Sequence, residues 1–187
     1  GAKIQLRNGI ADGGKTMRAS SSDAGAVLRF LDIYEYMQGG KIDLALSGGA
    51  EGPMTGQVDA RDFVLVNEPR LSSIVSTTPA GGDRSLNQAV RRDIDTSRVS
   101  FERLFSKVEK GTGYLRLSNG VLRGPLVGAS FQGSLYYQNG NMDMTGTFMP
   151  AYGLNRIFGE LPIVGALFGN GRDGGLIGVT FKLAGDA

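Results

Sequence analysis

Alternation of apolar and polar residues constrains the fold of this chain most, and it is clearest in residues 131–148, FQGSLYYQNGNMDMTGTF. Asn139-Gly140 at its centre is the dipeptide favoured in two-residue β-hairpin turns. Folding about this turn pairs Leu135 with Met144, and both strands then agree on which face is apolar. Periodicity alone would assign that face to an ordinary core. Its residues are Phe131, Leu135, Tyr137, Met142, Met144 and Phe148.

Similar patterns recur along the chain. Residues 40–48 and 56–67 each predict an amphipathic strand, and residues 175–185 predict a last strand. Ser118-Asn119-Gly120 separates two apolar runs and predicts another hairpin turn. Thirty glycines against six prolines fit turn-rich β structure better than a linker. Together these features predict a meander of long antiparallel strands.

Helices are predicted between the strands. The first begins at Ser22 or Asp23, either of which can cap a helix, and ends at Gly39-Gly40. Residues 68–77, EPRLSSIVST, predict one short helix with proline in its first turn. The fold class is therefore mainly β with flanking helices (α+β), an antiparallel sheet capped by short amphipathic helices.

A third helix is predicted from Phe101, because Leu104, Phe105 and Val108 follow it at helical spacing. The most polar stretch, residues 77–100, precedes it. A helix followed by strands thus occurs twice. The chain is interpreted as a single domain, residues 1–187, with two lobes as an open alternative, residues 1–76 and 101–187, joined by the polar excursion.

Near the C-terminus, YGLNRIFGELPIVGALFGNG is strongly apolar but too short to span a bilayer. Two short helices joined at Leu161-Pro162 would cover a sheet. The candidate capping residues are Leu154, Ile157, Phe158, Leu161, Val164 and Leu167.

Absences exclude several kinds of chemistry. Because the chain has no histidine and no cysteine, it cannot build a Ser-His-Asp triad, a Cys-His pair or a His/Cys zinc site. No catalytic residue, metal site or cofactor is predicted. The basic residues are scattered and the net charge is only +2, so nucleic acid is not an expected partner.

One motif suggests nucleotide binding. GIADGGKT, residues 9–16, fits the phosphate-loop pattern G-x-x-x-x-G-K-[ST]. Such a loop follows a buried parallel strand and opens a helix, whereas residues 2–7 alternate and no helix follows. We interpret the segment as a hairpin with a return strand over residues 15–20; a nucleotide hydrolase is a distant alternative. GNGRDG, residues 169–174, precedes a strand instead of a helix and is interpreted as a turn.

Longer stretches of the sequence resemble a known protein family. SSSDAGAVLRFLDIYEYMQGGKIDLAL, followed by GQVDARDFVLVNEPRLSSIVS, resembles the C-terminal region of the AsmA-like family of bacterial envelope proteins. That region has a Ser-x-Asp-x-Gly helix, a Gly-Gly strand start and a short P-x-L helix. Residues 100–169 and the last strand look like its closing part. The order and spacing of the motifs from Ser20 onward carry the resemblance, and residues 77–100 fit it less well.

The resemblance implies the C-terminal part of a periplasmic protein that an N-terminal helix, absent from this chain, anchors in the inner membrane. Its AsmA-, TamB- and YhdP-type relatives are bridge-like lipid transfer proteins, in which a long curved sheet forms a hydrophobic groove carrying phospholipid to the outer membrane. The hairpin's apolar residues would then face acyl chains, in a monomer without enzymatic activity. The alternative is a structural or assembly module that binds an envelope protein partner.

Overall fold

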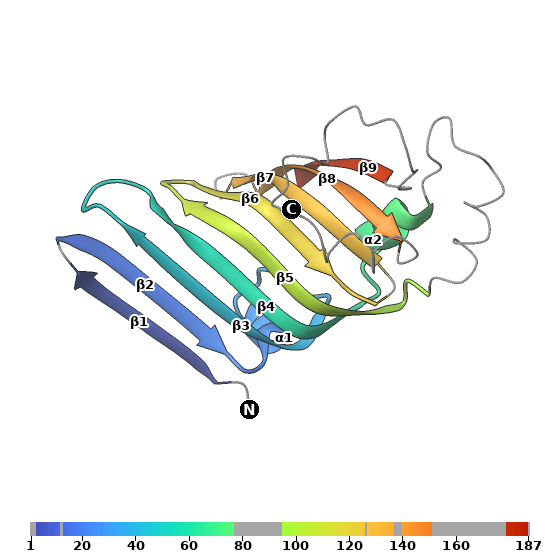
Figure 1. Ribbon diagram of the computed structural model, residues 1–187, viewed down its shortest axis with the longest axis horizontal. Helices are drawn as coiled ribbons and strands as arrows, with labels where there is room; N and C mark the ends of the chain where they lie inside the picture. Colours follow the sequence, from blue (N-terminus) through green and yellow to red (C-terminus); the bar gives the residue numbers. More distant parts are fainter. Residues whose placement is uncertain are drawn as a thin grey trace, which may run out of the picture.

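The computed structural model describes residues 3–11, 13–76, 95–125, 127–136, 140–150 and 179–186. They form one nine-stranded antiparallel sheet in which the strands lie in chain order, with two short helices (Figure 1). This confirms the predicted class, a long curved antiparallel sheet with flanking helices. The strands are β1 (Ile4–Ala11), β2 (Gly14–Ser21), β3 (Met37–Gly48), β4 (Met54–Val66), β5 (Arg98–Lys110), β6 (Tyr114–Arg123), β7 (Val127–Tyr136), β8 (Asn141–Pro150) and β9 (Val179–Asp186).

The phosphate-loop segment lies in the first hairpin. Gly9 pairs with Thr16 and Ile10 with Lys15, so the segment's two ends belong to antiparallel neighbours β1 and β2. Gly13 between them has φ +76°, a conformation that glycine adopts without steric cost. The predicted hairpin is confirmed, and the geometry of a phosphate-binding loop before a helix does not form there.

The first helix, α1 (Ala24–Phe30), is shorter than predicted. Asp23 caps its N-terminus, since its Oδ1 accepts the Ala26 N–H at 3.0 Å. The helix ends because Asp32 adopts φ +54° and the Ile33 N–H turns back to the Leu28 carbonyl at 2.9 Å. The prediction of an end at Gly39-Gly40 was wrong, because both glycines lie in β3.

The helix predicted from Phe101 was also wrong, because these residues form β5. Gly40 of β3 and Asp62 of β4 have φ +82° and +56°. Glu102 of β5 lies opposite Asp62, because the residues on either side of these two are register partners. At this shared bend, the alternation of side chains between the two faces of the sheet shifts by one residue in each strand. Phe101 lies in the core and Leu104 packs against it although the two are three positions apart, which imitates helical spacing.

Two predicted turns also need correction. Asn119, at φ +51°, does not turn the chain but forms a bulge within β6, where the pairing shifts between Leu117 and Gly120. In the 131–148 hairpin, Leu135 pairs with Met142 instead of Met144, a slip of two residues. A slip of two preserves the faces because side chains alternate with period two.

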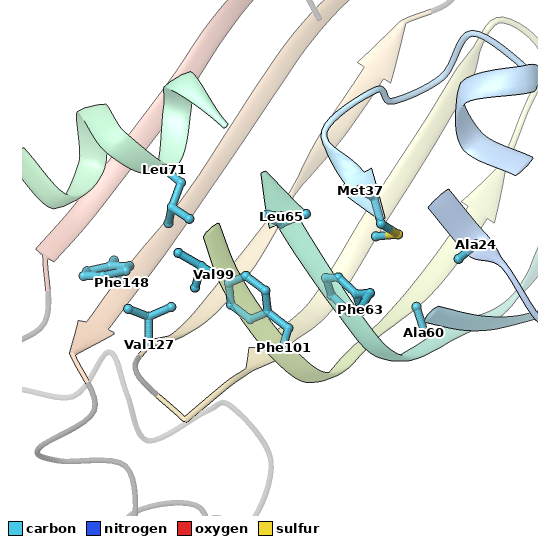
Figure 2. Packing of buried hydrophobic residues seen from close by; sticks show 10 residues of the cluster. All are labelled: Ala24, Met37, Ala60, Phe63, Leu65, Leu71, Val99, Phe101, Val127 and Phe148. Atoms are coloured by element: carbon cyan, nitrogen blue, oxygen red, sulfur yellow. The ribbon is translucent and has the colours of Figure 1, made fainter. Parts of the chain in front are cut away.

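The core lies where the two helices cover one end of the sheet. Ala24 of α1 and Leu71 of α2 (Pro69–Ser76) pack there against strand residues that are less than a tenth exposed (Figure 2). Phe63 and Phe101 stack at its centre, with ring centroids 5.4 Å apart. The short helix predicted over residues 68–77 is thereby confirmed. The cluster comprises Ala24, Met37, Ala60, Phe63, Leu65, Leu71, Val99, Phe101, Val127 and Phe148.

Some predictions fall outside the described residues. These are the capping residues Leu154, Ile157, Phe158, Leu161, Val164 and Leu167, the turn at 169–174 and most of the excursion at 77–100. Residues 98–100 belong to β5. β4 and β5 pair along their whole length, so the strands on either side of the excursion share one sheet; the division into two lobes stays a prediction.

Candidate functional site

One face of the sheet is apolar across its whole width. A single row of register partners crosses all nine strands, and only its first member, Asn8, is polar. The row runs Asn8, Met17, Leu46, Gly56, Val108, Leu117, Gly133, Met144 and Leu183. With strands about 4.8 Å apart, its eight steps extend for about 38 Å. That exceeds the hydrocarbon thickness of a whole bilayer, about 30 Å.

The helices α1 and α2 lie at one end of this face, where the core cluster packs (Figure 1). At the opposite end, Leu115, Leu135 and Met142 are register partners and all three stay partly exposed. At the β1 edge, Ile4, Leu6 and Ile10 are 51%, 59% and 84% exposed. The apolar face therefore continues beyond the part that the described helices cover.

The structure places most of the predicted lipid-facing residues on this face. Leu135, Met142 and Met144 lie toward the end away from the helices, and Phe131 packs beside Gly120 of β6. Phe148 is 6% exposed in the core cluster, so it is sealed beneath the helix end. Tyr137 lies outside the described residues.

Sequence reasoning confined the candidate face to one hairpin and missed the contribution of the other strands. Met17, Leu46, Val58 and Leu117 belong to the same face. The alternation in residues 40–48 already indicated part of it. What was missing was the register that aligns the apolar positions of separate hairpins.

The opposite face is polar. Lys41, Arg61, Arg103 and Arg123 are consecutive register partners on β3 to β6. Asp59 accepts hydrogen bonds from Arg61 and Arg103. Partial burial raises the pKa of Asp59, but these bonds outweigh it and hold the pKa below its ordinary value. Such exposed pairs add little stability, about 0–1 kcal/mol each. The sheet thus presents one charged, hydrated face and one apolar face.

A cavity of about 660 Å³ lies between the end of α1, the 31–36 segment and the start of α2. Glu68 in its wall is 5% exposed; it accepts the Tyr34 hydroxyl on Oε2 and the Arg70 N–H on Oε1. Burial first, and then the bond with Glu68, raises the pKa of Tyr34 far above its ordinary 10.0. This bond joins the segment after α1 to the N-terminus of α2.

Tyr34→Phe is expected to lower the free energy of unfolding by about 1–3 kcal/mol at pH 7, because it leaves a buried carboxylate oxygen unpaired. Because folding raises the pKa of Tyr34, the stability that its hydroxyl adds to the folded state is complete below pH 10, near the pKa of an unfolded tyrosine. This stability is lost as the pH rises further. Urea unfolding at neutral and alkaline pH tests this. The variant should show a smaller alkaline loss of stability than the wild type. The control is Tyr136→Phe, at a side chain 45% exposed; equal behaviour of the two variants would contradict the assignment.

In the part of the chain that the structure describes, no helix is long and apolar enough to cross a membrane, and no group of acidic side chains is arranged to hold a metal ion. The chain matches no family model, no curated protein and no solved structure.

Proposed function

We propose that this chain is a non-enzymatic, acyl-chain-binding part of a periplasmic protein anchored in the inner membrane, which helps to move phospholipid to the outer membrane. The observation that carries the proposal is the apolar row that crosses nine strands while the described helices cover one end of the face. The resemblance to AsmA-like proteins is the ground for the compartment and for phospholipid as the cargo.

The chemistry of the face suits acyl chains. Burial of a methylene group is worth about 0.8 kcal/mol and needs no directed contact. Fifteen buried methylenes would give about 12 kcal/mol, and a cost of about 4 kcal/mol for association would leave about 8 kcal/mol, which corresponds to micromolar affinity. Met17, Met142 and Met144 add flexible, polarisable side chains that adapt to chains of irregular shape.

A second candidate function is a structural module that binds an envelope protein. The observation in its favour is β1, an edge strand whose Ile4, Leu6 and Ile10 are at least half exposed. An unpaired edge with exposed apolar side chains is a template for another strand. This module would bind a protein along β1 and would not need the apolar face farther along the sheet.

Titration with a polyene fatty acid, whose fluorescence increases in apolar surroundings, tests the proposal. The folded 187-residue chain should give a saturable increase with micromolar affinity. The same chain unfolded in urea serves as the control and should give none. Absence of saturable binding by the folded chain would contradict acyl-chain binding and favour the structural module.

A further inference from the structure

The cavity at the helix end of the sheet has charged walls of both signs. Arg29, in the last turn of α1, and Arg70, in the first turn of α2, both line it. Asp32, Glu35 and Glu68 line it as well. No ion pair joins these arginines to these carboxylates among the described residues, so no direct contact between them occupies their charged ends.

The two arginines retain donors for a ligand. Arg29 uses one guanidinium nitrogen, Nη1, to donate to the Met37 carbonyl. Arg70 uses its backbone N–H for Glu68, while its guanidinium makes no hydrogen bond with a described residue. Guanidinium groups present paired donors that match the oxygens of a phosphate ester.

The carboxylates determine which other charge a ligand of this cavity must carry. Two guanidinium groups and three carboxylates line the cavity, and the hydroxyl that Glu68 accepts belongs to a neutral tyrosine, Tyr34. A phosphate alone would therefore meet a net negative wall. A phosphate ester that also carries a cationic group could pair with the arginines and with the carboxylates. The rings of Tyr34 and Tyr36, which line the cavity, suit an ammonium group.

Apolar surface adjoins the cavity. Ile33 lines it and is 63% exposed, and its neighbours Phe30 and Leu31 are 88% and 49% exposed. A polar cavity beside exposed apolar side chains matches a molecule with a charged head and hydrocarbon chains. Phe30 is the last residue of α1, the helix that covers the end of the apolar face, and Leu31 and Ile33 come just after it.

We propose that this cavity binds the head of a zwitterionic phospholipid, with the phosphate between Arg29 and Arg70 and the ammonium group against Asp32 and Glu35. The inference rests on the proposed function, because the chains of the same lipid would occupy apolar surface. It adds a place where a lipid is selected by its head at one end of the sheet.

Calorimetric titration with short-chain probes below their micellar concentrations tests the site. The probes are dihexanoyl phosphatidylcholine, dihexanoyl phosphatidylglycerol, free phosphocholine and an alkyl maltoside. The variant is Arg70→Gln, which keeps the backbone N–H that Glu68 accepts. The matched control is Arg116→Gln, which removes an exposed arginine paired with Glu109 on the polar face. Thermal unfolding of both variants establishes that they fold.

We expect phosphatidylcholine to bind about tenfold more tightly than phosphatidylglycerol, and Arg70→Gln to weaken phosphatidylcholine about tenfold while maltoside binding is unchanged. Arg116→Gln should change neither. Unchanged phosphatidylcholine affinity in Arg70→Gln would overturn the head site while acyl-chain binding stands. Free phosphocholine binding as tightly as the lipid would overturn it as a lipid site. Failure of every chain-bearing probe to bind the wild type would overturn the proposed function itself.

Discussion

Phe101→Ala is expected to lower the free energy of unfolding by about 3–5 kcal/mol, a large part of what a domain of this size has. Phe101 is 2% exposed and stacks on Phe63 between β4 and β5. Its removal leaves a cavity at the point where the core joins the two strands. Chemical denaturation of the wild type and the variant measures the difference.

Phe105→Ala is the matched control, since it removes the same side chain four residues along the same strand. Phe105 lies on the polar face, where Arg103 covers its ring at 5.5 Å. Its loss should cost about 1 kcal/mol. A helix would have placed Phe101 and Phe105 on one buried face. Similar large losses for both variants would therefore contradict the strand assignment.

Leu135→Asp is expected to reduce fatty-acid affinity at least tenfold, because it places a carboxylate among the apolar side chains that would contact the acyl chain. Leu135 pairs with Leu115 and Met142 at the end of the face away from the helices. The polyene titration measures the change. Thermal unfolding accompanies it, because Leu135 is partly buried.

Ser134→Asp is the control for this prediction. Ser134 precedes Leu135 and pairs with Arg116 and Asp143 on the polar face. The new charge is the same, but it lies on the hydrated side of the sheet, so fatty-acid affinity should be unchanged. Equal losses in the two variants would show that binding does not distinguish the faces.

The sequence was sufficient to predict antiparallel strands in chain order and, in one hairpin, which face is apolar, because period-two alternation survives errors in pairing. The 131–148 hairpin shows this: its register was wrong by two residues, yet Leu135, Met142 and Met144 share the predicted face. A slip of one residue would have reversed every side chain.

Bends and bulges could not be predicted from local patterns. Asp62 and Asn119 adopt positive φ, which few residues other than glycine do, and neither is a turn. The shared bend at Gly40 and Asp62 gave Phe101 and Leu104 a helical spacing within a strand. Asn119-Gly120 has the sequence of a hairpin turn, but the neighbouring strands accommodate it as a bulge.

The site was only partly predictable for a related reason. Its residues come from hairpins far apart in the chain, and Met17, Leu46 and Met144 lie in one row only because of long-range register. The cavity near α1 depends on Glu68 accepting the hydroxyl of Tyr34, 34 residues earlier in the chain. No local spacing signals such a contact.

Native mass spectrometry of the chain purified without detergent, with organic extraction of the same sample, tests the central claim most directly. We expect protein ions that carry phospholipid mass, phospholipid in the extract, and loss of both in Leu135→Asp while Ser134→Asp retains them. A folded wild-type chain free of lipid would contradict acyl-chain binding by the apolar face.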